Sequence, residues 1–192
     1  MDEHLPQRRS IRLHEYDYSQ AGAYFVTICA FRRIHLFGEV ARGRVELTEI
    51  GNIINQEWLK SLTLRRELML DRYVIMPDHM HGIVIIQSVG AHGRAPAVIT
   101  PNGRAHSRAP LRPTRSLGSF IAQFKAAVTA RVNAMRGMPG EPVWQRGYYE
   151  HVIRHEQELT AARAYICDNP AAWSLSEEYP PMPNWERSPS RR

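Results

Sequence analysis

The chain has 192 residues, of which 43% are hydrophobic, and this size and composition predict one globular domain with a substantial core. Its two cysteines, Cys29 and Cys167, form no Cys-x-x-Cys pair, which excludes a disulfide scaffold and the usual zinc finger or ribbon. No apolar run reaches the length of a membrane span, and the amino terminus lacks the apolar stretch of a signal peptide. We therefore expect a cytoplasmic protein without a membrane partner.

The net charge of +6 is concentrated in one segment. Residues 88–136 hold eight basic side chains and no acidic one, whereas the rest of the chain has 17 basic and 19 acidic residues. A basic block of this kind favours a polyanionic partner, most often nucleic acid. A solvated basic loop without any partner is the alternative.

The first part of the chain predicts an arm, a strand, a hairpin and a helix. Residues 1–20 hold several arginines but no sustained periodicity, so they are expected to form a basic amino-terminal arm. Residues 23–31 are rich in β-branched and aromatic side chains and predict a central strand. A hairpin is expected at residues 36–45. A helix with Thr48 as its N-cap should follow, because apolar side chains then recur at helical spacing.

The middle of the chain predicts two strands and a loop. The strands are expected at residues 68–76 and 81–87, and the short Pro77-Asp78 connection makes them antiparallel. Residues 88–113 are rich in Gly, Ala, Pro and Arg. This composition predicts a mobile basic loop, because it cannot bury enough apolar surface.

The last third predicts a helix, a strand, a helix and a tail. The first helix should begin near Thr114, and the strand should lie at residues 143–152. The final helix is expected at residues 156–168 and should be ended by Pro170. The proline-rich, charged residues 174–192 are expected to form a carboxyl-terminal tail.

The order of these elements is β-α-β-β-α-β followed by a helix. This order predicts an α+β fold with a ferredoxin-like or RRM-like antiparallel sheet. One domain is expected over residues 21–173. Its terminal helix can cover the face of the sheet that carries the hairpin of residues 68–87.

The most informative motif is the pair His79 and His81, separated by Met80. Because side chains alternate along a strand, both imidazoles should point to one face and Met80 to the other. Two convergent histidines suit a divalent cation whose other coordination positions stay open. The same pattern also occurs in strands that bind no metal.

Tyr165 and Asn169 are four residues apart on the final predicted helix and so share a face. A tyrosine hydroxyl is a nucleophile for phosphoryl transfer when a cation polarises the phosphate, and an Asn oxygen can bind the same cation. The alternative is structural, since a Tyr near a helix end often packs amphipathically and an Asn before Pro often marks a helix stop. Spacing alone leaves both interpretations open.

Three strings of the sequence resemble single-tyrosine HUH transposases, in particular their REP-associated branch. They are YVIMPDHMH at residues 73–81, VWQRGYYEHVIR at 143–154 and YICDNP at 165–170, and they occur in the order expected for that family. The resemblance also includes residues 8–12 and 22–27 and covers residues 8–173. Glu150 and His151 lie within the second string, and a hydrogen-bonded support of the sheet is the simplest role for them.

The resemblance implies a metal-dependent transposase that cleaves single-stranded DNA, on hairpin-forming palindromic repeats, and transfers the strand. It implies that His79 and His81 bind Mg²⁺ or Mn²⁺ and that Tyr165 is the nucleophile, which forms a 5′-phosphotyrosine intermediate. Asn169 stands where many relatives have Gln as the third metal ligand, and it is one methylene shorter. The resemblance to insertion-sequence relatives implies a dimer in which the tyrosine helix of one subunit completes the site of the other. The resemblance to the REP-associated branch implies a monomer, so both a monomer and a homodimer stay open.

Basic side chains of the arm, the loop and the second helix are the candidates for contacts with DNA phosphates. They are Arg8, Arg9, Arg12, Arg94, Arg104, Arg108, Lys125 and Arg131. Bases could also stack on Tyr16, Tyr18 or Tyr148, although the positions of these residues give no support for it.

Two other functions agree with parts of the pattern. A non-catalytic RRM-like nucleic-acid-binding module shares the topology and the charge. However, the chain lacks the aromatic consensus of such modules, and binding alone does not account for His79, His81 and Tyr165 together. A metal-dependent nuclease would use water as the nucleophile, with Asp78 or Glu150 as general base.

Overall fold

The computed structural model describes residues 20–87 and 116–175. The predicted loop, the predicted arm apart from Gln20, and nearly all of the predicted tail lie outside the described residues. The same is true of six of the eight candidates for DNA contacts, namely Arg8, Arg9, Arg12, Arg94, Arg104 and Arg108.

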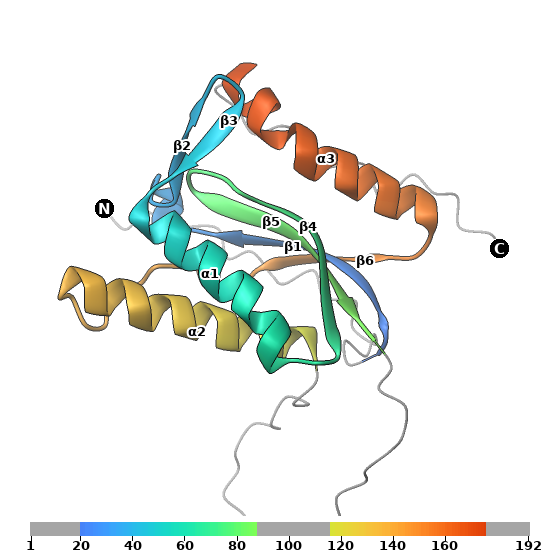
Figure 1. Ribbon diagram of the computed structural model, residues 1–192, viewed down its shortest axis with the longest axis horizontal. Coiled ribbons are helices and arrows are strands. Elements are labelled where there is room, and N and C mark those ends of the chain that lie inside the picture. The colour runs from blue at the N-terminus through green and yellow to red at the C-terminus, as the bar shows by residue number, and fades with distance from the viewer. Residues whose placement is uncertain (1–19, 88–115, 176–192) are drawn as a thin grey trace, which may run out of the picture.

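Four strands form an antiparallel sheet in the order β4-β5-β1-β6, and two short strands form a separate hairpin, β2-β3. The elements are β1 (Gly22–Cys29), the 3₁₀ helix η1 (Phe31–Arg33), β2 (Gly38–Ala41), β3 (Arg44–Leu47), α1 (Glu49–Leu64), β4 (Leu68–Ile75), β5 (His79–Ile86), α2 (Leu117–Arg136), β6 (Tyr149–Ile153) and α3 (Glu156–Leu175) (Figure 1). Apart from the inserted hairpin, this is the β-α-β-β-α-β arrangement with a terminal helix, and the predicted α+β fold is confirmed.

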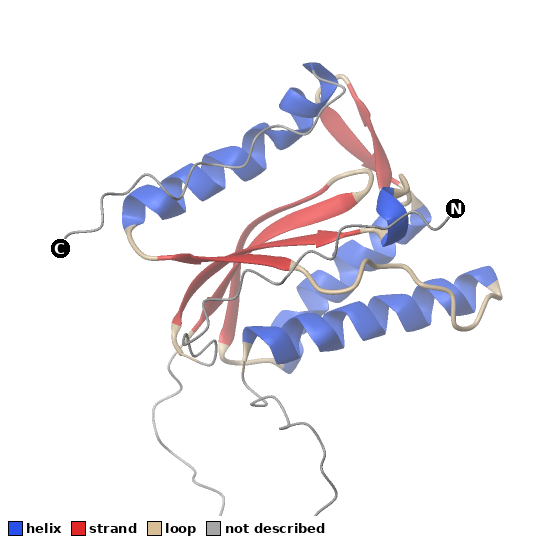
Figure 2. Cartoon of the chain, turned by 180° about the vertical axis from the view of Figure 1, so that it is seen from behind, coloured by secondary structure: helices blue, strands red, loops and turns tan. Residues whose placement is uncertain are grey.

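The sheet separates two helical layers (Figures 1 and 2). On one face α1 and α2 bury Trp58, whose ring centroid lies 5.4 Å from that of Phe120 and 5.1 Å from that of Phe124. On the other face α3 packs against a smaller cluster that includes Phe25 and Ile83. The sheet is therefore buried on both sides, and its α3 face is the one that carries the histidine motif.

Local sequence signals define the ends of α1 and α2. Thr48 caps α1 as predicted, because its hydroxyl accepts a hydrogen bond of 3.1 Å from the Gly51 amide. Ser116 caps α2 in the same way, with 3.2 Å to the Ser119 amide, so this helix begins slightly later than expected. α2 ends at Gly137, whose φ of 63° is a left-handed conformation that glycine adopts at little cost.

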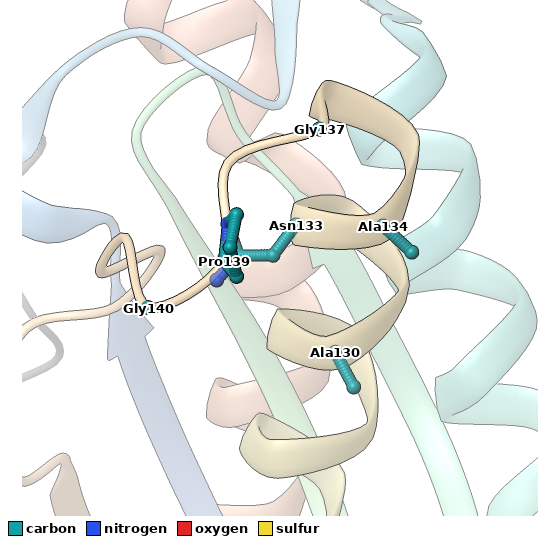
Figure 3. Close-up of a pocket in the computed structure, with 6 residues that line it drawn as sticks. All are labelled: Ala130, Asn133, Ala134, Gly137, Pro139 and Gly140. Atoms are coloured by element: carbon teal, nitrogen blue, oxygen red, sulfur yellow. The ribbon is translucent and has the colours of Figure 1, made fainter.

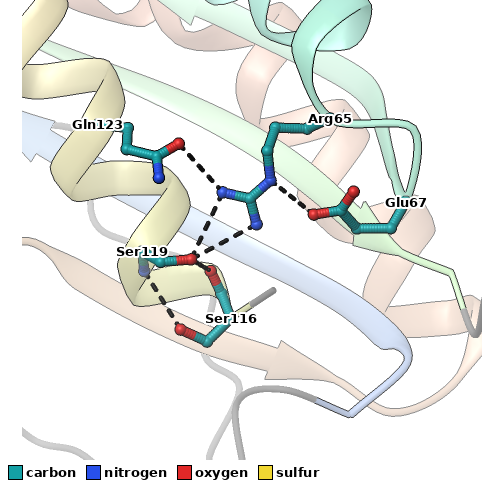
Figure 4. Close-up of polar contacts among 5 residues, drawn as sticks. All are labelled: Arg65, Glu67, Ser116, Ser119 and Gln123. Atoms are coloured by element: carbon teal, nitrogen blue, oxygen red, sulfur yellow. Dashed lines mark hydrogen bonds and ion pairs between the residues drawn. The ribbon is translucent and has the colours of Figure 1, made fainter. Parts of the chain in front are cut away.

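A polar cluster around Arg65 fixes the start of α2 to the connection between α1 and β4 (Figure 4). The Arg65 guanidinium donates to the Glu67 carboxylate, to Ser119 Oγ at 3.4 Å and to Gln123 Oε1 at 3.3 Å. Because Arg65 and Glu67 are both largely buried, this cluster stabilises the packing of α2 beside α1.

The predicted end of the last helix is wrong. α3 does not stop near Asp168 but continues through Pro170 to Leu175, which includes the first two residues assigned to the tail. A proline inside a helix removes the hydrogen bond to the carbonyl four residues earlier. Beyond Pro170 the helix lies against the hairpin β2-β3, where a Cβ placed on Gly43 would lie 3.7 Å from the Ala171 Cα.

The predicted strand at residues 143–152 is also shorter in the structure, where β6 runs from Tyr149 to Ile153. Before it, Trp144 forms an isolated bridge with Ala30, and Gly147 has a φ of 78°. This left-handed turn interrupts the extended backbone, so pairing with β1 begins only after it.

In residues 20–87 and 116–175, each helix is too short or too polar to span a lipid bilayer.

Candidate active site

The histidine pair lies in the strand β5, which begins at His79, two residues earlier than predicted. Both imidazoles face α3, whereas Met80 enters the core beneath α1 and α2, as strand alternation predicts. The two Nε2 atoms are 3.0 Å apart, and both side chains are almost completely buried. Two ring nitrogens thus converge on one point under α3.

The other ring nitrogen of each histidine is held by a neighbouring side chain. His79 Nδ1 lies 2.7 Å from Asp78 Oδ1, and because an ionised carboxylate only accepts, the imidazole donates this bond. His81 Nδ1 lies 2.8 Å from Oγ1 of Thr27, its cross-strand neighbour in β1. When the Thr27 hydroxyl accepts a hydrogen bond from His81 Nδ1, the proton of each neutral imidazole is on Nδ1 and both Nε2 atoms have free lone pairs. Metal-binding histidines are commonly oriented in this way.

Burial favours the neutral form of both imidazoles. It lowers the pKa of His81 well below its ordinary value, and the neighbouring His79 and Arg33 lower that pKa further. Burial also lowers the pKa of His79, although Asp78 opposes the shift. A neutral imidazole is the form that can bind a metal.

Asp78 is fixed behind His79 by a second contact. The Arg33 Nε lies 3.0 Å from Asp78 Oδ2, and its Nη1 donates to the Cys29 sulfur at 2.8 Å. The Asp78 side chain is only 4% exposed. This carboxylate therefore supports the ring of His79 and is shielded from solvent.

α3 brings Tyr165 to the histidine pair. The Tyr165 and His81 ring centroids are 5.1 Å apart in an edge-to-face arrangement, and the Phe25 ring contacts both. Burial raises the pKa of the Tyr165 phenol, whereas the nearby Asn169 amide and the positive charge of Arg33 lower it. The structure thus brings together the two motifs that lie far apart in the sequence.

Asn169 lies between two helix positions that touch the histidines. One turn before it, Tyr165 contacts His81, and one turn after it, the Trp173 ring centroid lies 5.8 Å from that of His79. Residues four apart share a helix face, so Asn169 faces the pair. Its side chain is near the Tyr165 phenol and almost completely buried, yet neither amide atom has a hydrogen-bond partner of standard geometry among the described residues.

The residues fit the divalent cation that the resemblance implies. In the described part of the chain no three His, Cys, Asp or Glu side chains converge as a metal site. The buried Asn169 amide, whose two polar atoms have no hydrogen-bond partner of standard geometry among the described residues, is the candidate for a third protein ligand. Adjacent ligands of an octahedral cation, at metal–ligand distances of about 2.1 Å, lie roughly 3.0 Å apart. The Nε2 atoms have this separation. The two imidazoles and the amide are neutral, so a cation bound by them would keep its charge to attract a phosphate.

Lys125 and Arg131, the two described candidates for DNA contacts, are not near this site. Both lie on α2, across the sheet from the histidine pair. The Lys125 ammonium donates to the carbonyls of Gln145 at 2.6 Å and Gly147 at 2.8 Å, and the Arg131 guanidinium donates to Glu57 at 2.8 Å. Their contacts are those of side chains that stabilise the helical layer.

The carboxylates considered as general bases for water are also poorly placed. Glu150 pairs in register with Val26, whose side chain belongs to the core under α1 and α2, so Glu150 lies on the face away from α3. Asp78 is engaged by its two neighbours. His151 faces α3 instead, and its Nε2 lies 3.5 Å from Glu158 Oε2, which connects β6 to the first turn of that helix.

A hollow on the surface lies at the end of α2 and does not belong to this site (Figure 3). Its lining contains no ionisable side chain and consists of Ala130, Asn133, Ala134, Gly137, Pro139 and Gly140.

The sequence did not predict the roles of Thr27, Arg33 and Trp173. Thr27 and Arg33 reach the site only through the register between β1 and β5 and the turn after β1, which no local pattern specifies. Trp173 could have been found, because it continues the four-residue spacing of Tyr165 and Asn169. The expected helix stop at Pro170 concealed it.

Comparison with known proteins agrees with this architecture. No family model matches the chain. An uncharacterized protein of Haemophilus influenzae is 36% identical to it over 176 residues, which are 91% of this chain and 94% of that protein. Among solved structures, a REP-associated tyrosine transposase bound to a REP hairpin is similar with a TM-score of 0.54 at 19% identity, over 86% of this chain and 76% of that one. The chain therefore belongs to the same family as the Haemophilus influenzae protein, and its fold is that of a REP-associated tyrosine transposase.

Proposed function

We propose that the protein is a metal-dependent transposase that cleaves single-stranded DNA beside a hairpin and transfers the strand through a 5′-phosphotyrosine. The observation that carries this proposal is the contact of the Tyr165 ring with that of His81, at 5.1 Å, beside a second imidazole whose Nε2 is 3.0 Å from that of His81. The fold shared with a transposase that binds a REP hairpin supports the choice of substrate.

The chemistry follows from the groups at the site. Mg²⁺ or Mn²⁺ held by His79, His81 and Asn169 would supply positive charge that polarises a phosphate oxygen. The Tyr165 oxygen attacks the scissile phosphorus and loses its proton, while the bond to the 3′ oxygen breaks and that oxygen takes up a proton. The products are a 5′-phosphotyrosine and a free 3′-hydroxyl. Because the phosphodiester energy is conserved, a 3′-hydroxyl can reverse the step and reseal DNA without ATP.

Neighbouring side chains have positioning roles in this proposal. Thr27 and Asp78 hold the two imidazole rings through their Nδ1 atoms. The positive charge of Arg33 favours the phenolate of Tyr165, which opposes the effect of burial on the pKa of that phenol. These groups keep the site ordered before the substrate arrives.

The attachment of α3 supports a site completed within one subunit. Arg163, two residues before Tyr165, donates to Asp71 Oδ2 of β4 through Nη2 at 2.6 Å and Nε at 3.0 Å. This contact holds the helix of the nucleophile over its own sheet. A single strand can approach such a partly covered site more easily than a duplex can.

A labelled DNA hairpin with single-stranded flanks tests the proposal. With Mn²⁺, the protein should form a covalent adduct that survives a denaturing gel, and Tyr165→Phe should abolish it. Cleavage without an adduct that persists in Tyr165→Phe would support the water-dependent nuclease instead. Binding without any cleavage would support the non-catalytic module, and either result would contradict the proposal.

A further inference from the structure

A row of aromatic rings leads from the buried histidine pair to the surface. The His79 ring centroid is 4.5 Å from that of His81 and 5.8 Å from that of Trp173. The Trp173 centroid is in turn 5.8 Å from that of His35, on the loop after η1. His79 is buried, Trp173 is partly exposed and His35 is exposed, so the outer two rings are accessible from solvent.

Trp173 lies at the edge of the described core. It belongs to neither of the two hydrophobic clusters that the described residues form, and its ring lies beside those of His79 and the exposed His35. Trp173 lies near the carboxyl end of α3, where this helix passes beside the hairpin β2-β3 (Figure 1). A large aromatic residue at this place borders the histidine pair on one side and solvent on the other.

The turn that precedes His35 adds positive charge in an unusual backbone conformation. Arg32 and Arg33 are consecutive non-glycine residues with φ values of 54° and 57°. Such left-handed positions are uncommon for side-chain-bearing residues and often occur at functional sites. Arg33 reaches Asp78, whereas Arg32 is exposed and lies over the Phe31 ring at 5.2 Å.

We propose that the Trp173 ring, with the His35 ring edge-on to it at an interplanar angle of 60°, forms a subsite that stacks on one unpaired nucleobase next to the cleaved phosphate, with the exposed Arg32 favouring the DNA backbone. This inference rests on the proposed function and deepens it. Proteins that bind single strands combine aromatic stacking platforms with positive charge. Because a base in a duplex is already stacked and paired, the subsite selects an unpaired strand at the reacting position.

The test measures binding in a Tyr165→Phe background, where no cleavage occurs. Fluorescence anisotropy compares hairpin oligonucleotides that carry one abasic residue at each unpaired position in turn. At one position, removing the base should weaken binding about 5- to 150-fold, the range for one stacked base. The Trp173→Leu variant keeps apolar volume but has no aromatic face. It should bind the intact oligonucleotide as weakly as the parent binds the oligonucleotide that is abasic at this position, and removing the base should then cause no further loss of affinity.

Two further variants keep the test decisive. His35→Ala changes an exposed side chain, so it should fold normally and reduce the penalty of the same abasic position even if changes at Trp173 disturb folding. Tyr148→Ala, which alters an aromatic residue packed against the α1–α2 core, should leave the penalty unchanged. The proposal is overturned if the abasic penalties in both the Trp173 and His35 variants equal those of the parent.

The failure of this inference can be told apart from the failure of the proposed function. Formation of the Tyr165-dependent adduct without any coupling between Trp173 or His35 and a base would refute only the stacking subsite. Coupling at one base without an adduct in the unsubstituted protein would support the subsite and refute the proposed function.

Discussion

The Tyr165 ring of α3 lies edge-on to the His81 ring of β5, and Phe25 of β1 contacts both rings. This contact requires α3 to lie on the face of the sheet that carries the histidines. Apolar packing of Ile166 and Ala162 and the pairing of Arg163 with Asp71 keep the helix there. The nucleophile and the candidate metal ligands of one chain therefore occupy one site.

The Asp78→Asn substitution should weaken metal binding. The amide has no charge to favour the orientation of His79 in which Nε2 faces the cation, and it also loses the ion pair with Arg33. Loss of a partner that orients a metal-binding histidine typically lowers metal affinity about 10- to 100-fold. Isothermal titration with Mn²⁺ in the absence of DNA measures this change directly.

Glu57→Gln is the matched control for that experiment. It also removes a buried carboxylate that is paired with an arginine, but Glu57 lies on α1, across the sheet from the histidines. Its Mn²⁺ affinity should equal that of the unsubstituted protein. Equal losses in both variants would show that Asp78 has no specific role at the metal.

Arg131→Ala should lower stability and leave DNA binding nearly unchanged, in contrast to the sequence-based expectation for Arg131. The substitution leaves the buried Glu57 carboxylate without its closest cation, which we expect to cost about 1 kcal/mol. Urea unfolding measures this loss. The salt dependence of hairpin binding should keep its slope, and a shallower slope would indicate that Arg131 contacts a phosphate after all.

Lys125 should make the free energy of unfolding depend on pH in the alkaline range. Burial lowers its pKa from 10.5 to about 8 in the folded protein. The unfolded chain therefore binds more protons than the folded protein between these values, so Lys125 makes the free energy of unfolding rise with pH across this window. Urea unfolding at several pH values should show a steeper rise for the unsubstituted protein than for Lys125→Met. Parallel curves would contradict the assigned pKa.

Gly82→Ala should destabilise the fold, because the new Cβ would lie 2.7 Å from Cζ2 of the buried Trp58. The Trp58 ring cannot move freely, since Phe120 and Phe124 pack against it. Overpacking of this kind typically costs about 1–3 kcal/mol, measurable by urea unfolding. In a Trp58→Phe background the cost should be smaller, and an undiminished cost would point to backbone strain instead.

Local signals in the sequence predict much of this fold. Thr48 caps its helix as expected, and the alternation of His79, Met80 and His81 correctly assigns each side chain to a face of the sheet. These features depend on neighbours in the chain, so no knowledge of the tertiary structure is needed. Periodicity alone does not bring Tyr165 to His81. That the two distant motifs form one site is predicted only from their resemblance to a family.

Features that depend on tertiary contacts could not be predicted in this way. Pro170 is a strong local signal for a helix stop, but contacts of α3 with the sheet and the hairpin extend the helix to Leu175. The partner of the His81 Nδ1 is Thr27, which only the register of β1 with β5 determines. The sequence likewise does not show whether a basic side chain contacts DNA or forms an ion pair within the protein, as Arg131 does with Glu57.

The central claim is that the phenol of Tyr165 becomes linked to DNA. The protein is incubated with Mn²⁺ and a hairpin oligonucleotide, the adduct is digested with trypsin and nuclease, and tandem mass spectrometry locates the remaining nucleotide. We predict a 5′-phosphate nucleotide on Tyr165, with no adduct when Tyr165 is replaced by Phe. A nucleotide attached to any other side chain, or an equal yield of adduct from the Phe variant, would contradict the account.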